Sequence, residues 1–238
     1  MAEEEKKKIK KRKKRRNYKK ENEVKEKKKK VPANPIPEKQ YYRFKDRLIE
    51  ISKENKDRNL MIFQIGIATG YRTGDIVDLT IAEIEDAIED EKFVIQEKKQ
   101  YKAWKTYQRQ KKDSDPNRKC PSPMDTIIES NLIELLEAYI EGKKRSEYAF
   151  KSSKYKSKHI SAKSYSEILS KVGLSLGLEN ISGHSMRKTY AHRLYDDNKN
   201  LEFVRKNLNH KSIVTTQCYL GLDSEMKKDA AKIASRKL

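Results

Sequence analysis

Apolar residues recur at helical spacing along most of the chain beyond residue 37. Residues 58–69 are mostly apolar, which predicts a buried helix, and Gly70 suits its C-terminal end. A preceding helix is predicted over residues 38–56, because the apolar positions there fall at near-helical intervals: Tyr41, Phe44, Leu48, Ile49 and Ile51.

Further helices are predicted after residue 74. A short one begins over Asp75–Leu79. Ser122-Pro123 provides an N-cap and a first-turn proline for a helix through about Ile140, which Gly142 ends. The remaining helical segments are Ser161–Leu176, His184–Tyr195, Leu201–Leu208, Ser212–Tyr219 and a charged segment from Ser224 onward.

Strand-like content is confined to the middle of the chain. Phe93–Gln96 and Arg118–Ser122 are predicted to pair as a small hairpin. No internal repeat is visible. The pattern therefore predicts a mainly α fold with one small antiparallel β-hairpin or sheet.

The first 37 residues differ from the rest. Residues 1–30 hold 17 Lys/Arg against 6 Asp/Glu, and residues 31–37 contain three prolines. A segment this poor in apolar side chains cannot offset its ordering entropy by burial. We therefore expect a basic tail with a proline-rich linker over residues 1–37, and one folded domain over 38–238.

The net charge of +20 and pI near 9.7 indicate a polyanionic partner. Nucleic acid is favoured over an anionic membrane surface, and a basic surface that is only solvated is the alternative.

Cys120 and Cys218 are too few for a disulfide framework and fit no metal-ligand cluster, so neither metal nor cofactor is expected. The chain has no apolar run of membrane-spanning length and no signal-peptide pattern. We expect a cytoplasmic protein associated with the nucleoid, or a nuclear one in a eukaryotic host.

The most informative residues lie near the C-terminus. Gly183-His184-Ser185-Met186-Arg187 is followed by Asn209-His210-Lys211-Ser212 and then by Tyr219. Residues three apart are neighbours on a helix, so His184 and Arg187 share a face. The set contains a nucleophile, a cation and proton-transfer groups, which suits phosphodiester chemistry without a metal.

Residues 183–221 resemble the C-terminal signature of the tyrosine recombinases, the phage integrase family. The matching patterns are His-x-x-Arg, Leu-x-His-x-Ser and Thr-Thr-x-x-Tyr. Residues 69–79, with Arg72 after a Thr-Gly turn, resemble a further element of that family. The resemblance covers about residues 40–225. It implies the fold of the DNA breaking-rejoining enzymes, which is mainly helical with a small sheet.

The resemblance also implies roles for the motif residues. Tyr219 would be the nucleophile, and Arg72 and Arg187 would clamp the phosphate, for which the guanidinium fork is suited. His210 would donate a hydrogen bond to the scissile phosphate, and His184 would assist proton removal from Tyr219. Taken singly, each residue has an ordinary alternative as a packing tyrosine, a surface arginine or a structural histidine.

The general acid is the least defined role. The family uses a lysine on the hairpin, which tends to end the first strand. Lys99 is favoured, with Lys98 as the alternative; because the segment after Gln100 is long and basic, Lys102 or Lys105 could also serve. The expected DNA contacts are Lys11, Arg12, Lys13, Lys14, Arg15, Arg16, Lys102 and Lys105.

The expected function is site-specific DNA recombination through a covalent 3′-phosphotyrosine, without metal or ATP. Double-stranded DNA would be the partner, with a homotetramer on paired sites and a monomer or weak oligomer in the free protein. Most relatives carry a helical core-binding domain before the catalytic domain, and no full one is evident here. The alternatives are a type IB topoisomerase and a catalytically silent DNA-binding protein that keeps the fold.

Overall fold

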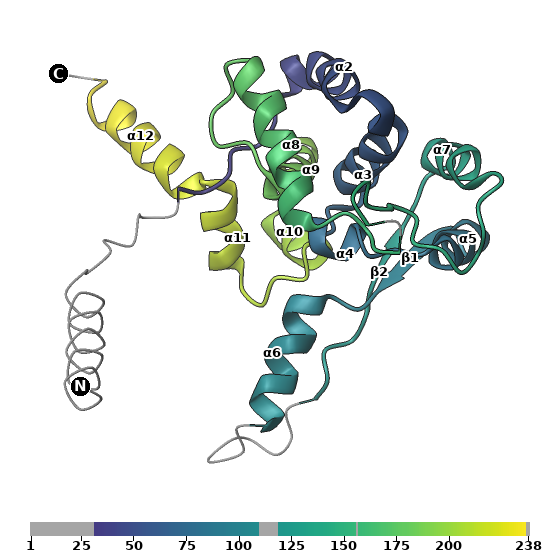
Figure 1. The fold of residues 1–238 in the computed structure, drawn as a ribbon. Coiled ribbons are helices and arrows are strands. Elements are labelled where there is room, and N and C mark those ends of the chain that lie inside the picture. The colour runs from purple at the N-terminus through teal and green to yellow at the C-terminus, as the bar shows by residue number, and fades with distance from the viewer. Residues whose placement is uncertain (1–30, 110–118, 156, 237–238) are drawn as a thin grey trace, which may run out of the picture. The chain divides into compact units, whose positions relative to one another are not determined.

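A computed structural model describes residues 31–109, 119–155 and 157–236. The chain divides into two units, Met1–Pro32 and Ala33–Leu238. All the helices and strands described below belong to the second unit, which Figure 1 shows as a helical assembly with one short sheet. The DNA contacts predicted between Lys11 and Arg16 lie outside the described residues.

The N-terminal half of this unit is built on a buried helix. Two short 3-10 helices, Glu38–Gln40 and Lys53–Asn55, flank α2 (Tyr41–Ser52). Helix α3 (Lys56–Thr69) packs against α2, α7 and α9, and Phe63 at its centre is fully buried. Gly70 ends α3 with φ +67°, a left-handed conformation that favours glycine. Helices α4 (Thr73–Ile76) and α5 (Ile81–Glu89) follow.

Two antiparallel strands make up the sheet in the described part of the chain. β1 (Lys92–Ile95) pairs with β2 (Met124–Ile127), with Phe93 opposite Thr126. Between them, α6 (Lys98–Arg109) extends from the body of the unit, and none of its residues is fully buried (Figure 1). The connection between the strands is therefore a helical insertion rather than a tight hairpin.

Six helices complete the unit: α7 (Ser130–Ile140), α8 (Ala162–Ser175), α9 (Gly183–Asn198), α10 (Leu201–Asn207), α11 (Ile213–Leu220) and α12 (Leu222–Ala234). A large core joins α2, α3, α4, α5, α7 and α8 with the sheet and the start of α9. A second, smaller core lies between α9, α10 and α11, and contains Tyr190, Val204 and Leu220. Two apolar clusters thus meet along α9.

The predicted fold class is confirmed, and most helices lie where they were predicted. The second strand was placed wrongly: residues 119–123 have no regular structure, and β2 begins at Met124. Pro121 and Pro123 lack the N–H that a strand ladder needs, so pairing starts after them. Ser122-Pro123 does not begin a helix, because the residues that follow, Met124–Ile127, pair with β1 as a strand. Helix α7 starts only at Ser130, where Leu132 and Leu136 can reach the core.

Candidate active site

Arg187 lies at the junction of three segments that are distant in sequence. Helix α9 begins at a capping box in which Ser182 accepts from the start of the helix, and this places Arg187 one turn inside. Its side chain is 2% exposed. It donates to the carbonyl of Gly70 at 2.7 Å and to that of Leu208 at 2.5 Å. The buried guanidinium therefore joins the end of α3 to the end of α10.

Arg72 approaches Arg187 from the turn that follows α3. It is the N-cap residue of α4, with an extended backbone. Its guanidinium donates to the carboxylate of Glu97, whose side chain is only 2% exposed. Nη2 of Arg187 lies 3.7 Å from the same Glu97 oxygen. The two arginines therefore flank one buried carboxylate.

Glu97 was not among the predicted site residues. It lies between the end of β1 and the start of α6. Its second oxygen accepts from Gln100 and, at 3.3 Å, from Nδ2 of Asn209. Nothing in the local sequence distinguishes Glu97 from the other acids of a chain with 36 Asp and Glu residues. Only the folded arrangement brings its partners around it.

The two predicted histidines border the arginine pair. Nδ1 of His210 lies 3.1 Å from the hydroxyl of Thr216. Burial, with the charges of Arg187 and Arg72 nearby, lowers the pKa of His210 to about 4. The pKa of His184 is also lowered, first by partial burial of its ring and then by the same arginines. Both rings are therefore neutral near pH 7.

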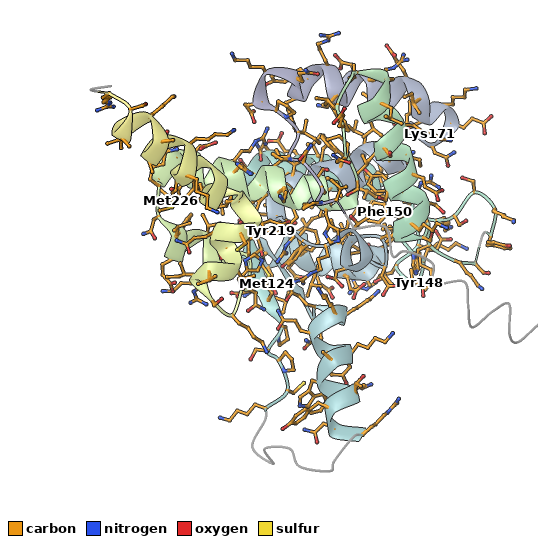
Figure 2. All side chains as sticks on the ribbon, turned by 90° about the vertical axis from the view of Figure 1, so that its left-hand side faces the viewer. Met124, Tyr148, Phe150, Lys171, Tyr219 and Met226 are labelled. Carbon is orange, nitrogen blue, oxygen red and sulfur yellow. The ribbon has the colours of Figure 1, made fainter. Side chains whose placement is uncertain are left out.

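Tyr219 lies on α11, which Ser212 caps through the backbone N–H of Thr215. Within the described residues, its buried hydroxyl has no hydrogen-bond partner. Burial raises the pKa of Tyr219 to about 12, although Arg187 and Arg72 oppose the increase. In Figure 2 Tyr219 lies among packed side chains, whereas Met226 lies on the exposed helix α12.

The ring of Tyr219 also has close neighbours. Its centroid is 5.3 Å from that of His210 in an edge-to-face arrangement, and Nζ of Lys188 lies 5.4 Å from the Tyr219 centroid. Burial lowers the pKa of Lys188. The phenol is thus surrounded by a neutral imidazole, an ammonium group and two guanidinium groups.

The candidate lysines differ in their surroundings. Lys98 pairs with Asp78, and its Nζ lies 3.4 Å from the carbonyl of Gly74. Lys99 is exposed, and its charge lies close enough to lower the pKa of His184. Both lysines lie in the first turn of α6, so the expectation that the lysine ends the first strand was wrong, because β1 stops at Ile95.

Lys102 and Lys105 lie further along α6 and are exposed. Nζ of Lys105 is 4.6 Å from the centroid of the Tyr101 ring, which stacks on Trp104. These residues lie one and two turns beyond the arginine pair and its carboxylate. They extend the basic surface away from the site.

The fold thus brings together five of the six predicted site residues, with Lys99 at the margin: Arg72, His184, Arg187, His210 and Tyr219. In the part of the chain that the structure describes, no cluster of His, Cys, Asp or Glu is suited to hold a metal ion. Among those same residues, no helix is both long and apolar enough to cross a membrane.

The chain is similar to named proteins from bacteria and archaea. The "Probable integrase/recombinase YoeC" of Bacillus subtilis (strain 168) is 30% identical over 183 residues, which cover 77% of this chain and 87% of that protein. "Tyrosine recombinase XerA" of Pyrococcus furiosus is 25% identical over 190 residues, which cover 79% of this chain and 59% of that protein.

Solved structures share the fold at low identity. A crystal structure of XerA recombinase superposes with a TM-score of 0.56 at 17% identity, and the match covers 88% of this chain and 66% of that one. The XerH recombinase bound to its palindromic difH substrate superposes with a TM-score of 0.57 at 19% identity, over 87% of this chain and 54% of that one. The chain thus spans about half to two thirds of these recombinases.

A sequence profile covers most of the chain as well. Residues 36–226 match the profile of the phage integrase family, and they include every predicted site residue from Arg72 to Tyr219. Together with the 30% identity to a relative that is aligned over most of its length, this match leads to a plain assignment. The chain belongs to the phage integrase family.

Proposed function

We propose that the protein is a site-specific DNA recombinase that cuts and rejoins DNA through a covalent 3′-phosphotyrosine at Tyr219, without metal or ATP. One observation carries this proposal above the others: the buried hydroxyl of Tyr219 is held under the combined charge of Arg187 and Arg72. Burial raises the pKa of this phenol to about 12, and the charges of the two arginines, which a phosphodiester also needs, act against that increase.

The cleavage step follows from these groups. The phenol oxygen of Tyr219 attacks the scissile phosphorus, and the bond from phosphorus to the 5′-oxygen breaks. Arg72 and Arg187 stabilise the negative charge on the non-bridging oxygens. His184, neutral near pH 7, accepts the phenol proton. When the hydroxyl of Thr216 donates to Nδ1 of His210, Nε2 carries the ring proton and can donate it to the phosphate.

Lys99 supplies the proton to the departing 5′-oxygen in this proposal. Its exposed side chain lies near His184, whereas Lys98 is engaged by Asp78. Because the phosphotyrosine linkage conserves the energy of the broken bond, the 5′-hydroxyl of a second strand can reverse the step. No ATP is then consumed, and in this proposal the two guanidinium groups take the charge-neutralising role that a metal ion would otherwise fill.

The DNA contacts extend from the site along the basic helix α6. We assign Lys102 and Lys105 to the phosphate backbone, because both are exposed and the described part of α6 carries no acidic residue. Phosphate contacts of this kind give strongly salt-dependent binding. Residues 11–16, which lie outside the described residues, would add further phosphate contacts through their basic side chains.

The proposed organisation is a catalytic domain over residues 38–238 with a basic tail and linker over 1–37. We further propose that it acts as a homotetramer on paired DNA sites and is a monomer or weak oligomer when free. Met226 and Ile233 support this, since they are 63% and 61% exposed on α12 and would be covered by a neighbouring subunit. We also propose a cytoplasmic, nucleoid-associated location, or a nuclear one in a eukaryotic host, because the DNA substrate lies there.

A covalent trapping experiment tests the proposal. The protein is incubated with nicked suicide duplexes tiled across the DNA that flanks its own gene, and products are separated on denaturing gels. We expect a protein–DNA band that Tyr219→Phe abolishes. The control Tyr195→Phe should retain it, because Tyr195 packs against the same small core. Salt-sensitive binding without any band would instead favour a silent DNA-binding protein.

A further inference from the structure

Glu97 combines deep burial with contacts to four separate segments. Its side chain is 2% exposed, and Arg72, from the turn before α4, donates to its Oε1. Asn209, from the loop between α10 and α11, donates to Oε2 at 3.3 Å, and Gln100 of α6 donates to the same oxygen. Arg187 of α9 completes the set at 3.7 Å. The donors around Glu97 together form an anion-binding site, and the anion that occupies it is the carboxylate of the protein's own side chain.

The chemistry of that site matches a phosphodiester. A carboxylate and a phosphate both offer two oxygens to a guanidinium fork, and both carry the charge that offsets two neighbouring arginines. Nη1 of Arg72 donates to Oε1 of Glu97, and Nη2 of Arg187 lies 3.7 Å from the same oxygen. A phosphate oxygen that takes this position between the two guanidinium groups displaces the carboxylate.

We propose that in the free protein Glu97 occupies the position between Arg72 and Arg187 that the scissile phosphate takes on DNA, so that the site is self-inhibited until DNA displaces it. The inference rests on the proposed function, because it uses the assignment of the two arginines to the phosphate. It adds a competitor within the chain that regulates access to them.

The surroundings of Glu97 allow this displacement. The segment lies between the end of β1 and α6, a helix with no fully buried residue, so little packing is lost when it moves. Gln100 and Asn209, which both contact Glu97, also line an open cavity of 460 Å³ bordered by β2 and the end of α10. The released carboxylate can therefore reach solvent on that side.

Release of Glu97 also affects the proposed general acid. Lys99 follows Glu97 by two residues, and both belong to the connection that leads into α6. When the carboxylate leaves the arginines, the start of α6 shifts with it and Lys99 changes position. Phosphate binding is thereby coupled to the position of the lysine.

Inorganic phosphate tests the competition without any knowledge of the DNA site. Binding is measured by calorimetry for the wild-type chain, Glu97→Gln and Glu97→Ala. Glu38→Gln is the matched control, since it makes the same charge change at an exposed pair with Arg193. Both Glu97 variants should bind phosphate about tenfold more tightly or better, as expected when a competing state that holds most of the population is removed. The control should match the wild type.

Unchanged or weaker phosphate binding by folded Glu97 variants would overturn the inference, since Glu97 would then only position the arginines. If the variants fail to fold, hydrogen exchange of the wild-type chain decides. Phosphate should speed exchange in residues 96–100 when it displaces the carboxylate, and unchanged or slower exchange there would refute the displacement.

The trapping assay separates this inference from the proposed function. The Glu97 variants should form the covalent adduct at lower protein concentration than the wild type. If the Glu97 variants bind phosphate more tightly but no form of the protein gives an adduct, the competition between Glu97 and phosphate is supported while the proposed reaction fails. If the wild type forms the adduct but the Glu97 variants do not, and phosphate binding is unchanged, the inference about Glu97 fails while the proposed reaction stands.

Discussion

At the scale of single residues, burial and charge act together on the groups around the phosphate position. Arg72 and Arg187 lower the pKa of both histidines and oppose the increase in the pKa of Tyr219. Burial and these two cations together keep the imidazoles neutral, and the cations also favour the phenolate. A bound phosphate would weaken both effects by neutralising the arginines. The protonation state of the site thus depends on whether an anion is present.

The depressed pKa of His210 makes a prediction about stability. Its pKa is about 4 in the folded state against about 6.5 when unfolded, so the unfolded chain binds the extra proton first. Stability from this group is complete above the unfolded value and is lost as pH falls from about 6.5 toward 4. Urea unfolding at a series of pH values measures this effect. Across that window, the free energy of unfolding should fall less for His210→Gln than for the wild type, by on the order of 1–2 kcal/mol after allowance for solvent screening. Parallel curves for the two proteins would contradict the shift.

At the scale of elements, the site depends on close approach between α3 and α9. A Cβ at Gly70 would lie 2.3 Å from the Tyr190 ring, at φ +67°. Gly177 has a similar φ of +71° but no atom within 4 Å of such a Cβ. Alanine substitutions at these two glycines therefore separate the cost of backbone strain from the cost of steric crowding.

We expect Gly177→Ala to cost about 1 kcal/mol in the free energy of unfolding, since only the left-handed conformation opposes it. Gly70→Ala should cost at least about 3 kcal/mol, because the Tyr190 ring must also move. Urea denaturation measures both. Equal losses would mean that the two helices are less closely packed than described.

Helix α6 makes a second prediction at this scale. Replacing Lys102 or Lys105 by Gln should weaken DNA binding for all sequences alike, and each should reduce the slope of log K against log salt by about 1. Fluorescence anisotropy at several salt concentrations measures the slope. Lys171→Gln on α8 is the control, because it removes an exposed charge from a helix outside the site (Figure 2). An equal change in that control would mean that only net charge matters.

Much of the helical framework could be predicted from apolar periodicity, and the ordered motifs identified Arg187, His210 and Tyr219. The second strand was misplaced because Pro121 and Pro123 exclude the preceding segment from pairing, a constraint the apolar pattern does not express. Glu97 was missed for a different reason. Its partners come from segments that are far apart in sequence, so its role exists only in the fold.

At the scale of the whole molecule, the proposed recombination on paired sites needs more than one copy of the chain. The exposed apolar side chains of α12 predict that a neighbouring subunit covers this helix on DNA. Light scattering should show a monomer or weak oligomer in the free protein and a tetramer when paired sites are added. A chain truncated after Gly221 should still bind DNA but remain monomeric there. A tetramer from the truncated chain would contradict the assignment of α12.

The most direct measurement identifies the amino acid that carries the DNA. Trapped covalent adduct is digested with protease and nuclease, and the modified peptide is sequenced by mass spectrometry, with reactions run in the presence of a chelator and without ATP. The proposed mechanism predicts a nucleotide 3′-phosphate on Tyr219 and a free 5′-hydroxyl on the other strand end. A 5′-linked adduct, attachment to another residue, or loss of the adduct with the chelator would contradict it.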